Sequence, residues 1–273
     1  MKLADALEVV VRSDPGMIRP HNEDAVFADA ALGLAVLADG MGGYNAGEIA
    51  SGMATAVLAN SFSRFLPTWR PGVPGFADPA VAGDYLRSEV GAANSAIYHA
   101  AQSQPQYAGM GTTLVLAWLY DNHLSVAHVG DSRLYRWRAG QLMQLTRDHS
   151  FLQEQIDSGL ISAEEARHSQ NRNLVTRALG VDPTVEVEVR DFPVEAGDLL
   201  LLCSDGLNDM VEDEEIALTL HALGANLPLA AEQLIQMAND NGGRDNVSVI
   251  LLRIKGDFTV DRSWWQKLKG FFG

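Results

Sequence analysis

Three aspartates stand at the ends of apolar segments of strand length, in surroundings that suit a small ligand. Asp39 ends one such segment and is followed by glycine, Asp205 follows a second segment, and Asp245 precedes a third. A buried strand can hold a carboxylate rigidly at the edge of a core, and glycine allows a close approach. A single Asp-Gly pair is typical of a turn, but three such strand ends together predict a site built from carboxylates.

Carboxylates in this setting favour cations that prefer oxygen ligands, namely Mg²⁺ or Mn²⁺. Histidine and cysteine are absent from these positions, which argues against zinc. One carboxylate can bridge two metal ions roughly 3.5–4 Å apart, and such a pair can activate water for in-line attack on a phosphate. Arg19, beside the acidic pair Glu23 and Asp24, is the candidate anion clamp because a guanidinium binds phosphate oxygens in a bidentate fork.

Three other chemistries are excluded by missing motifs. The chain has no G-x-x-x-x-G-K-[ST] loop, which a nucleotide triphosphatase of that type requires. Cys203 is not followed by an arginine that could cradle a phosphate, so it is interpreted as a core residue at the end of a buried strand. A G-x-S-x-G nucleophile elbow is also absent.

The composition indicates an ordinary globular protein. Its 273 residues suit one large domain or at most two small ones, and 47% hydrophobic residues are enough for a core. The net charge of −15 argues against a nucleic-acid partner, because phosphate backbones would repel this surface. A single cysteine, no signal-peptide pattern and no long apolar run predict a soluble, cytoplasmic protein.

The order of predicted elements indicates an α+β fold class. Helices are expected in two pairs, at 45–65 and 79–102 and at 213–223 and 227–239. Ile49 and Val81 are assigned to the buried faces of the first two helices by their helical spacing. Strands are expected at 7–12, 25–27, 34–38, 112–120, 124–129, 133–137, 142–145, 185–189, 198–203 and 247–254, with hairpin turns at 121–122 and 139–140. This pattern predicts a central β-sandwich of two mainly antiparallel sheets, flanked by pairs of helices.

Domain boundaries follow from changes in composition. Residues 1–256 are predicted to form one domain, with a polar, mobile flap at about 148–180 that has too few apolar residues to bury much surface. Residues 257–273 form a predicted amphipathic tail containing Trp264 and Trp265. This tail could dock on the domain itself, on a partner protein or on a membrane interface, and membrane contact is the least favoured of the three. A monomer is expected.

Six motifs occur in the order found in a known family. They are Arg19-x-x-x-Glu23-Asp24, Asp39-Gly40-Met41-Gly42-Gly43, Gly111-Thr112-Thr113, Gly130-Asp131-Ser132-Arg133, Ser204-Asp205-Gly206-Leu207 and Asp245-Asn246. Together they resemble the metal-dependent protein serine/threonine phosphatases, the PPM or type 2C family, in its compact bacterial branch. The resemblance covers about residues 7–254, and it implies the same helix-flanked β-sandwich with a flap.

The resemblance also implies a set of metal ligands. Asp39 would bridge two ions, Mn²⁺ or Mg²⁺, and Asp205 and Asp245 would complete the first site. The backbone carbonyl of Gly40 would help to hold the second ion. Asp131, together with Asp205, would form a weaker third site of the kind seen in bacterial members.

The resemblance assigns the remaining residues to substrate and water. Glu23 and Asp24 would accept hydrogen bonds from metal-bound waters, and Arg19 would bind the substrate phosphate. The nucleophile would be a metal-bridging hydroxide, with no phosphoenzyme. Many eukaryotic members place a histidine general acid where this chain has Met41, so leaving-group protonation falls to a metal-bound water. His149 resembles the family sequence that enters the flap, where a structural role is the commoner one.

The predicted function is hydrolysis of phosphoserine and phosphothreonine in proteins, opposing a cognate Ser/Thr kinase. One alternative is a non-catalytic phosphoprotein-binding scaffold on the same fold, but such a protein would be expected to lose metal carboxylates, and here all of them remain. An enzyme acting on small phosphorylated metabolites would predict a closed pocket. A flap beside a surface metal site suits protein substrates better.

Overall fold

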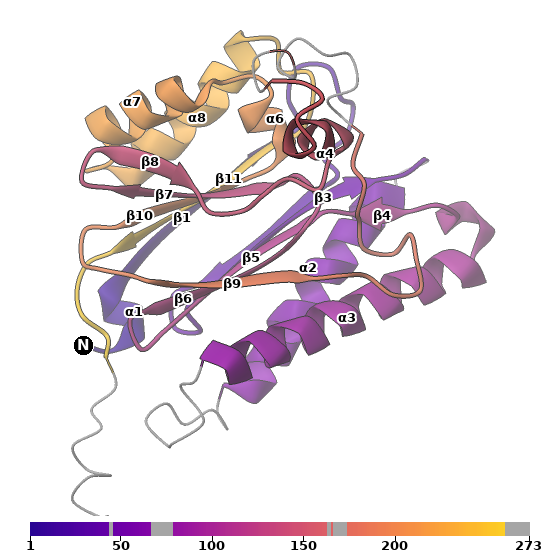
Figure 1. Cartoon of the computed structure of the whole chain (residues 1–273), viewed down its shortest axis with the longest axis horizontal. Coiled ribbons are helices and arrows are strands. Elements are labelled where there is room, and N and C mark those ends of the chain that lie inside the picture. Colours follow the sequence, from indigo (N-terminus) through magenta and orange to yellow (C-terminus); the bar gives the residue numbers. More distant parts are fainter. Residues whose placement is uncertain (44–45, 67–78, 163–164, 166–173, 260–273) are drawn as a thin grey trace, which may run out of the picture.

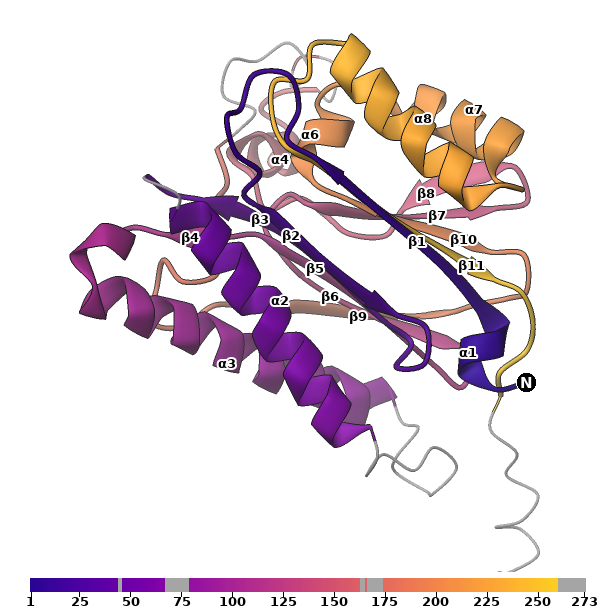
Figure 2. The ribbon, with the colours of Figure 1, turned by 180° about the vertical axis from the view of Figure 1, so that it is seen from behind.

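Strand pairing divides the chain into two antiparallel sheets that face each other, each covered on its outer side by a pair of helices (Figures 1 and 2). The structure, a computed structural model, describes residues 1–43, 46–66, 79–162, 165 and 174–259. Helices α2 (Ala46–Phe65) and α3 (Pro79–Ser103) cover one sheet, and α7 (Asp213–Leu223) and α8 (Leu227–Asp240) cover the other. The predicted α+β sandwich is confirmed.

The first sheet has the strand order β1-β11-β10-β7-β8, in which the last strand of the chain lies between the first and the tenth. Its strands are β1 (Leu7–Asp14), β11 (Val247–Ile254), β10 (Leu199–Cys203), β7 (Arg133–Arg138) and β8 (Gln141–Gln144). The second sheet has the order β2-β3-β5-β6-β9, with β4 paired to β3. Its strands are β2 (Asp24–Asp29), β3 (Leu34–Met41), β4 (Gly111–Thr112), β5 (Leu114–Tyr120), β6 (His123–Val129) and β9 (Glu188–Pro193).

Four short helices complete the described elements: α1 (Leu3–Ala6), the 3₁₀ helix η1 (Pro105–Tyr107), α4 (Phe151–Asp157) and α6 (Asp205–Asn208). Helix α4 begins at a cap in which the Ser150 hydroxyl accepts a hydrogen bond from the Gln153 amide. It lies in the predicted flap, of which residues 163–164 and 166–173 lie outside the described residues.

Three apolar layers hold the sandwich together. The layer between the sheets includes Leu37, Val115, Leu200 and Ile250, all fully buried. One outer layer packs α2 and α3 against the second sheet, and the other packs α7 and α8 against the first. Because residues alternate sides along a strand, the nearly continuous apolar runs of β3, β5 and β10 bury both of their faces.

The hairpin turns form where the sequence predicts them. Asp121 and Asn122 have φ angles of 45° and 57°, and Ala139 and Gly140 have φ angles of 49° and 83°. Positive φ at both central residues matches the twist of the flanking strands, and therefore favours tight hairpins. These two turns set the pairing of β5 with β6 and of β7 with β8.

The predicted buried faces of α2 and α3 are wrong at Ile49 and Val81. Ile49 is 36% exposed and Val81 is 42% exposed, whereas α2 instead buries Ala50, Ala54 and Leu58 against the sheet. Alanine lets the helix axis approach the sheet closely, so the small residues occupy the contact and the larger ones lie beside it. The strand predicted at 185–189 begins only at Glu188 and continues to Pro193.

The chain beyond β11 starts by packing on the domain. Phe258 is 4% exposed and belongs to the apolar layer between the sheets, and its amide donates to the side chain of Asn122. Residues 260–273, which contain the aromatic part of the predicted tail, lie outside the described residues. Among the helices that are described, none is both long enough and apolar enough to cross a membrane.

Candidate metal centre

Asp39 lies near the end of β3, directly opposite Asp24 of β2. Its backbone is fixed from the neighbouring strand segment, since the Asp39 amide donates to the Thr113 hydroxyl at 3.1 Å and the Asp39 carbonyl accepts from the Thr113 amide at 2.8 Å. The Thr112 hydroxyl also donates to this carbonyl, at 2.8 Å. Two carboxylates from paired strands are thus held side by side before any ligand arrives.

Gly40 allows the end of β3 to touch the start of α2. A Cβ atom at this position would lie 2.2 Å from the Gly47 carbonyl oxygen and 2.5 Å from the Glu23 carbonyl oxygen. The Gly40 amide donates to the same Glu23 oxygen at 3.2 Å. At Gly47, an added Cβ would meet the Glu23 carboxylate at 2.9 Å. Both glycines are therefore needed for the close approach that places Glu23 at the centre.

Asp205 and Asp245 come together because α6 starts against the beginning of β11. Asp205 is the first residue of α6, and a Cβ on the following Gly206 would lie 2.0 Å from the Asn246 carbonyl oxygen. The Ser204 hydroxyl donates to Asp24 Oδ2 at 2.8 Å and accepts from the Ser248 amide at 2.9 Å. Ser204 thus joins the Asp24 carboxylate of one sheet to the strands of the other.

Asn246 organises the loop that carries Arg19 and Glu23. Its side-chain oxygen accepts from the Glu23 amide at 2.8 Å, and its side-chain nitrogen donates to the carbonyls of Pro15 and His21 at 3.0 and 2.9 Å. This bracing role of Asn246 is not among the roles predicted from the sequence. The Asp-Asn pair before an apolar strand was the available signal, because a buried amide must satisfy both its donor and its acceptor.

Burial and mutual repulsion raise the pKa values of these carboxyl groups. The pKa of Asp39 lies well above its usual range because the group is buried and because Asp24, Asp205, Asp131 and Asp245 surround it with negative charge. The same two causes raise the pKa of Asp205 well above its usual range. Burial is also the main cause that raises the pKa of Asp24 to about 6 and that of Asp131 to about 7.

Two buried carboxylate oxygens in this cluster have no hydrogen-bond partner in the described part of the chain, which indicates a cation site. Among the described residues, Asp24 Oδ1 and Asp205 Oδ1 are shielded from solvent and have no hydrogen-bond partner. A buried carboxylate oxygen without a partner is costly unless a cation satisfies it. The donor set is made of carboxylates with nearby backbone carbonyls, which fits Mg²⁺ or Mn²⁺.

Arg19 supplies positive charge at the exposed side of the cluster. Its guanidinium donates to Asp245 Oδ2 at 2.7 Å, and its side chain is 49% exposed. Burial lowers the pKa of Arg19, but the charges of Asp245, Glu23 and Asp205 outweigh this effect and raise it. For Glu23, burial raises the pKa while Arg19 opposes that change.

A cavity of about 290 Å³ borders the cluster on the side of the predicted flap. Asp131 and Asp205 line it from one side, and Leu152 and Gln153 of α4 line it from another. The structure therefore gathers the predicted residues at one end of the sandwich. They are Arg19, Glu23, Asp24, Asp39, Gly40, Asp131, Asp205 and Asp245.

Fold and site together define a class: helix-flanked antiparallel sandwiches with an aspartate cluster at the strand ends. The family profile described as "Protein phosphatase 2C" matches residues 20–247. The chain belongs to the protein phosphatase 2C family.

Relatives in this family are similar over most of the chain. The serine/threonine protein phosphatase PstP of Mycobacterium tuberculosis is 41% identical over 254 residues, which is 90% of this chain but only 44% of PstP. The chain therefore spans less than half the length of that relative. The serine/threonine phosphatase stp of Listeria welshimeri is 38% identical over 244 residues, 88% of this chain and 93% of the relative.

A solved structure of the PstP catalytic domain, in complex with two manganese ions, superimposes with a TM-score of 0.79 at 40% sequence identity. The superposition covers 91% of this chain and 98% of that one. The predicted family resemblance is confirmed, and the likeness includes the two-sheet core on which the aspartate cluster stands.

Proposed function

We propose that this chain is a metal-dependent phosphatase that removes phosphate from phosphoserine and phosphothreonine in proteins. The observation that carries the proposal is the group of aspartates with two buried, unpartnered oxygens, placed at the strand ends of a protein phosphatase 2C sandwich. The named relatives are serine/threonine phosphatases, and one of them is described with two manganese ions.

The aspartates of the cluster are the proposed metal ligands. Asp39, Asp205 and Asp245, with the Gly40 carbonyl, would hold two ions of Mn²⁺ or Mg²⁺, and Asp131 would contribute to a third. When bound, such ions act as Lewis acids and lower the pKa of water to near neutrality. The protein's own task is to fix these ligands in advance, which the paired strands do through the Asp39 backbone bonds.

Arg19 would bind the substrate phosphate. Within the described part of the chain, its half-exposed guanidinium makes one ion pair, with Asp245. A guanidinium can bridge two phosphate oxygens while keeping one contact to a carboxylate. Glu23 and Asp24 would accept hydrogen bonds from metal-bound waters, and the bonds from Asn246 and Ser204 keep the two residues in place.

The arrangement favours protein substrates supplied by a Ser/Thr kinase. Arg19 is accessible at the surface, and the flap helix α4 borders the adjoining cavity. A phosphorylated side chain on a protein surface could therefore approach without being enclosed. We also propose action in the cytoplasm, which the single, buried Cys203 supports because it suits a reducing compartment. We propose a monomer as the active form.

The deciding experiment is Mn²⁺-dependent release of phosphate from a phosphothreonine peptide. Wild type is expected to turn over only with metal, and Asp39→Ala and Asp205→Ala are expected to abolish the turnover. A folded wild-type protein that binds Mn²⁺ and the phosphopeptide without turnover would overturn the enzyme proposal. That result would favour the non-catalytic scaffold on the same fold.

A further inference from the structure

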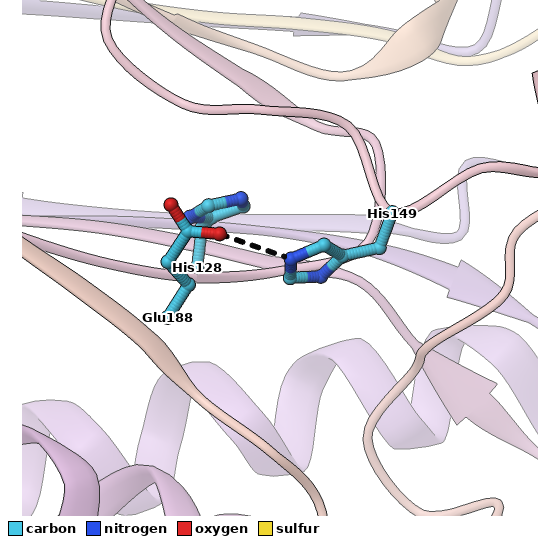
Figure 3. A group of neighbouring side chains, drawn as sticks. All are labelled: His128, His149 and Glu188. Carbon is cyan, nitrogen blue, oxygen red and sulfur yellow. Dashed lines mark hydrogen bonds and ion pairs between the residues drawn. The ribbon is translucent and has the colours of Figure 1, made fainter. Parts of the chain in front are cut away.

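A second group of titratable side chains lies where the predicted flap begins (Figure 3). It consists of His128 from β6, His149 from the segment before α4, and Glu188 from β9. One ligand atom from each lies within 4.8 Å of the others. The two imidazole rings stack with centroids 4.6 Å apart and an interplanar angle of 19°, and both residues are buried.

The hydrogen bonds decide which ring nitrogen carries the proton. His149 Nδ1 accepts from the Gly130 amide at 3.2 Å, so in the neutral ring Nε2 carries the hydrogen, and it faces Glu188 Oε2 at 3.5 Å. His128 Nε2 lies 2.7 Å from the Arg147 carbonyl oxygen, which can only accept. Burial lowers the pKa of both rings and therefore favours these neutral forms.

This pattern opposes a metal site. Two histidines and a glutamate are a donor set that zinc uses, and His128 keeps Nδ1 available as a lone pair. A metal-bound His149, however, would have to present a lone pair at Nε2, which would place a hydrogen on Nδ1 facing the Gly130 amide. The structure therefore shows His149 as a hydrogen-bonded residue that accepts from the Gly130 amide and faces Glu188 (Figure 3).

His149 holds Gly130 through both backbone groups. Besides the amide bond to Nδ1, the Gly130 carbonyl accepts from the His149 amide at 2.9 Å. Gly130 has φ +104°, and a Cβ there would lie 2.7 Å from Thr113 Cβ, so its backbone conformation is one that other residues rarely adopt. The residue that follows is Asp131, whose charge acts on both Asp39 and Asp205.

We infer that His149 is a positioning residue for the metal centre, because it clamps the turn at Gly130 and thereby aims the Asp131 carboxylate at the aspartate cluster, while Glu188 orients its ring. The inference rests on the proposed function, since it deepens the role of one of its ligands. His149 also ties the flap to this turn, because its carbonyl accepts from the Thr176 amide at 2.8 Å.

Two substitutions of His149 test its contact with Gly130 separately from its contact with Glu188. In His149→Asn the side-chain oxygen stands near the position of Nδ1, so it keeps an acceptor for Gly130 but loses the donor to Glu188. In His149→Gln the amide reaches toward the position of Nε2, so it keeps a donor for Glu188 but withdraws the acceptor from Gly130. His123→Asn, on the same strand as His128, is the matched control.

The measurement is calorimetric binding of Mn²⁺ to the full chain, with thermal melting of each variant and then peptide turnover. His149→Gln is expected to weaken the weakest Mn²⁺ step about tenfold, as loss of a partner that orients a metal ligand commonly does. His149→Asn and His123→Asn are expected to stay close to wild type. Equal losses in His149→Asn and His149→Gln would overturn the inference, because the Gly130 acceptor would not be the cause.

A double variant tests whether His149 acts through Asp131. Asp131→Asn with His149→Gln is expected to bind Mn²⁺ no worse than Asp131→Asn alone, whereas additive losses would overturn the inference. Tight Zn²⁺ binding in saturating Mg²⁺ that His149→Asn abolishes would overturn it too, because Nε2 would then be a ligand. If wild type binds Mn²⁺ without turnover, the proposed function fails while the binding comparison still tests His149.

Discussion

Strand β10 has a buried aspartate near each end, and the two differ in whether their carboxylate oxygens have hydrogen-bond partners. Asp198, just before the strand, is 1% exposed and accepts from Arg138 through both of its oxygens, at 2.6 and 2.5 Å. Asp205, just after the strand, has a buried oxygen with no partner among the described residues. A buried carboxylate paired with an arginine is satisfied within the fold and is costly to break, whereas one left without a partner marks a place where a cation is expected.

The sharpest test of this contrast is activity. Asp205→Asn is expected to lower Mn²⁺-dependent kcat about 100- to 1000-fold, as loss of a major electrostatic contributor does. Asp198→Asn should leave kcat close to wild type at a temperature where it stays folded. Turnover of the phosphothreonine peptide measures both, and comparable losses in the two variants would remove the distinction between the two ends of β10.

In the metal-free protein, the buried carboxylates of the aspartate cluster should make stability depend on pH. The pKa of Asp24 is raised to about 6 from an unfolded value of about 3.9. The folded state therefore keeps a proton that the unfolded state has lost, so this contribution to stability is present below pH 4 and is lost as the pH rises toward 6. The size is about 3 kcal/mol, and Mn²⁺ should restore stability at the higher pH.

Urea unfolding of metal-free wild type and Asp24→Asn between pH 4 and 7 tests this effect. Asp24 also helps to raise the pKa values of Asp39 and Asp205, so the variant loses that part of their contribution in the same direction. His128 and His149, whose pKa values burial lowers, act in the opposite direction but are present in both proteins. The free energy of unfolding of wild type should fall relative to that of the variant as the pH rises. Parallel curves would contradict the assignment.

Asp198→Asn is expected to destabilise the fold by about 2 kcal/mol, because Arg138 loses the more buried of its two described carboxylate partners and keeps the exposed Glu195. The cost stays below that of a fully buried pair because the Arg138 side chain is 28% exposed. Chemical denaturation measures it, with Arg138→Met as the control that removes the guanidinium. An unchanged unfolding midpoint would show that the pair contributes nothing.

The smallest expected effect concerns Arg19, which pairs with Asp245. Arg19→Lys is expected to raise the KM for the phosphopeptide about tenfold, because lysine cannot form the bidentate contact with a phosphate. Stability should not change, since Arg19 is half exposed and touches Asp245 through one nitrogen. A change in melting temperature as large as that of Asp198→Asn would show instead that Arg19 mainly stabilises the fold.

The aspartates at the strand ends could be predicted from the sequence because the pattern that marks them lies in consecutive residues. An apolar run, an aspartate and a glycine follow one another at Asp39 and Asp205, so each end is visible without knowing its neighbours. The turn at Asp121 and Asn122 is local in the same way, because both residues tolerate positive φ. The family motifs then supplied the order in which these ends meet.

Features that depend on distant partners could not be read in this way. The buried face of α2 depends on how closely the sheet approaches Ala50 and Ala54, so periodicity alone selected Ile49 instead. His128, His149 and Glu188 come from three separate elements, and none of them has a neighbour in the sequence that indicates the cluster. Asn246 braces residues more than 200 positions away, which only the closed first sheet brings within reach.

The position of β11 determines when this site can exist during synthesis. Among the described strands, β1 pairs with β11 alone, with Leu7 opposite Ile254, so the first strand gains this partner only after almost the whole domain has been made. Asp245 and Asn246 precede β11 directly. A growing chain therefore carries most of the aspartates of the cluster before Asp245 and the strand that completes the first sheet have been made. Under the proposed function, the site is completed in one late step, and a fragment that ends before Asp245 is expected to show no turnover.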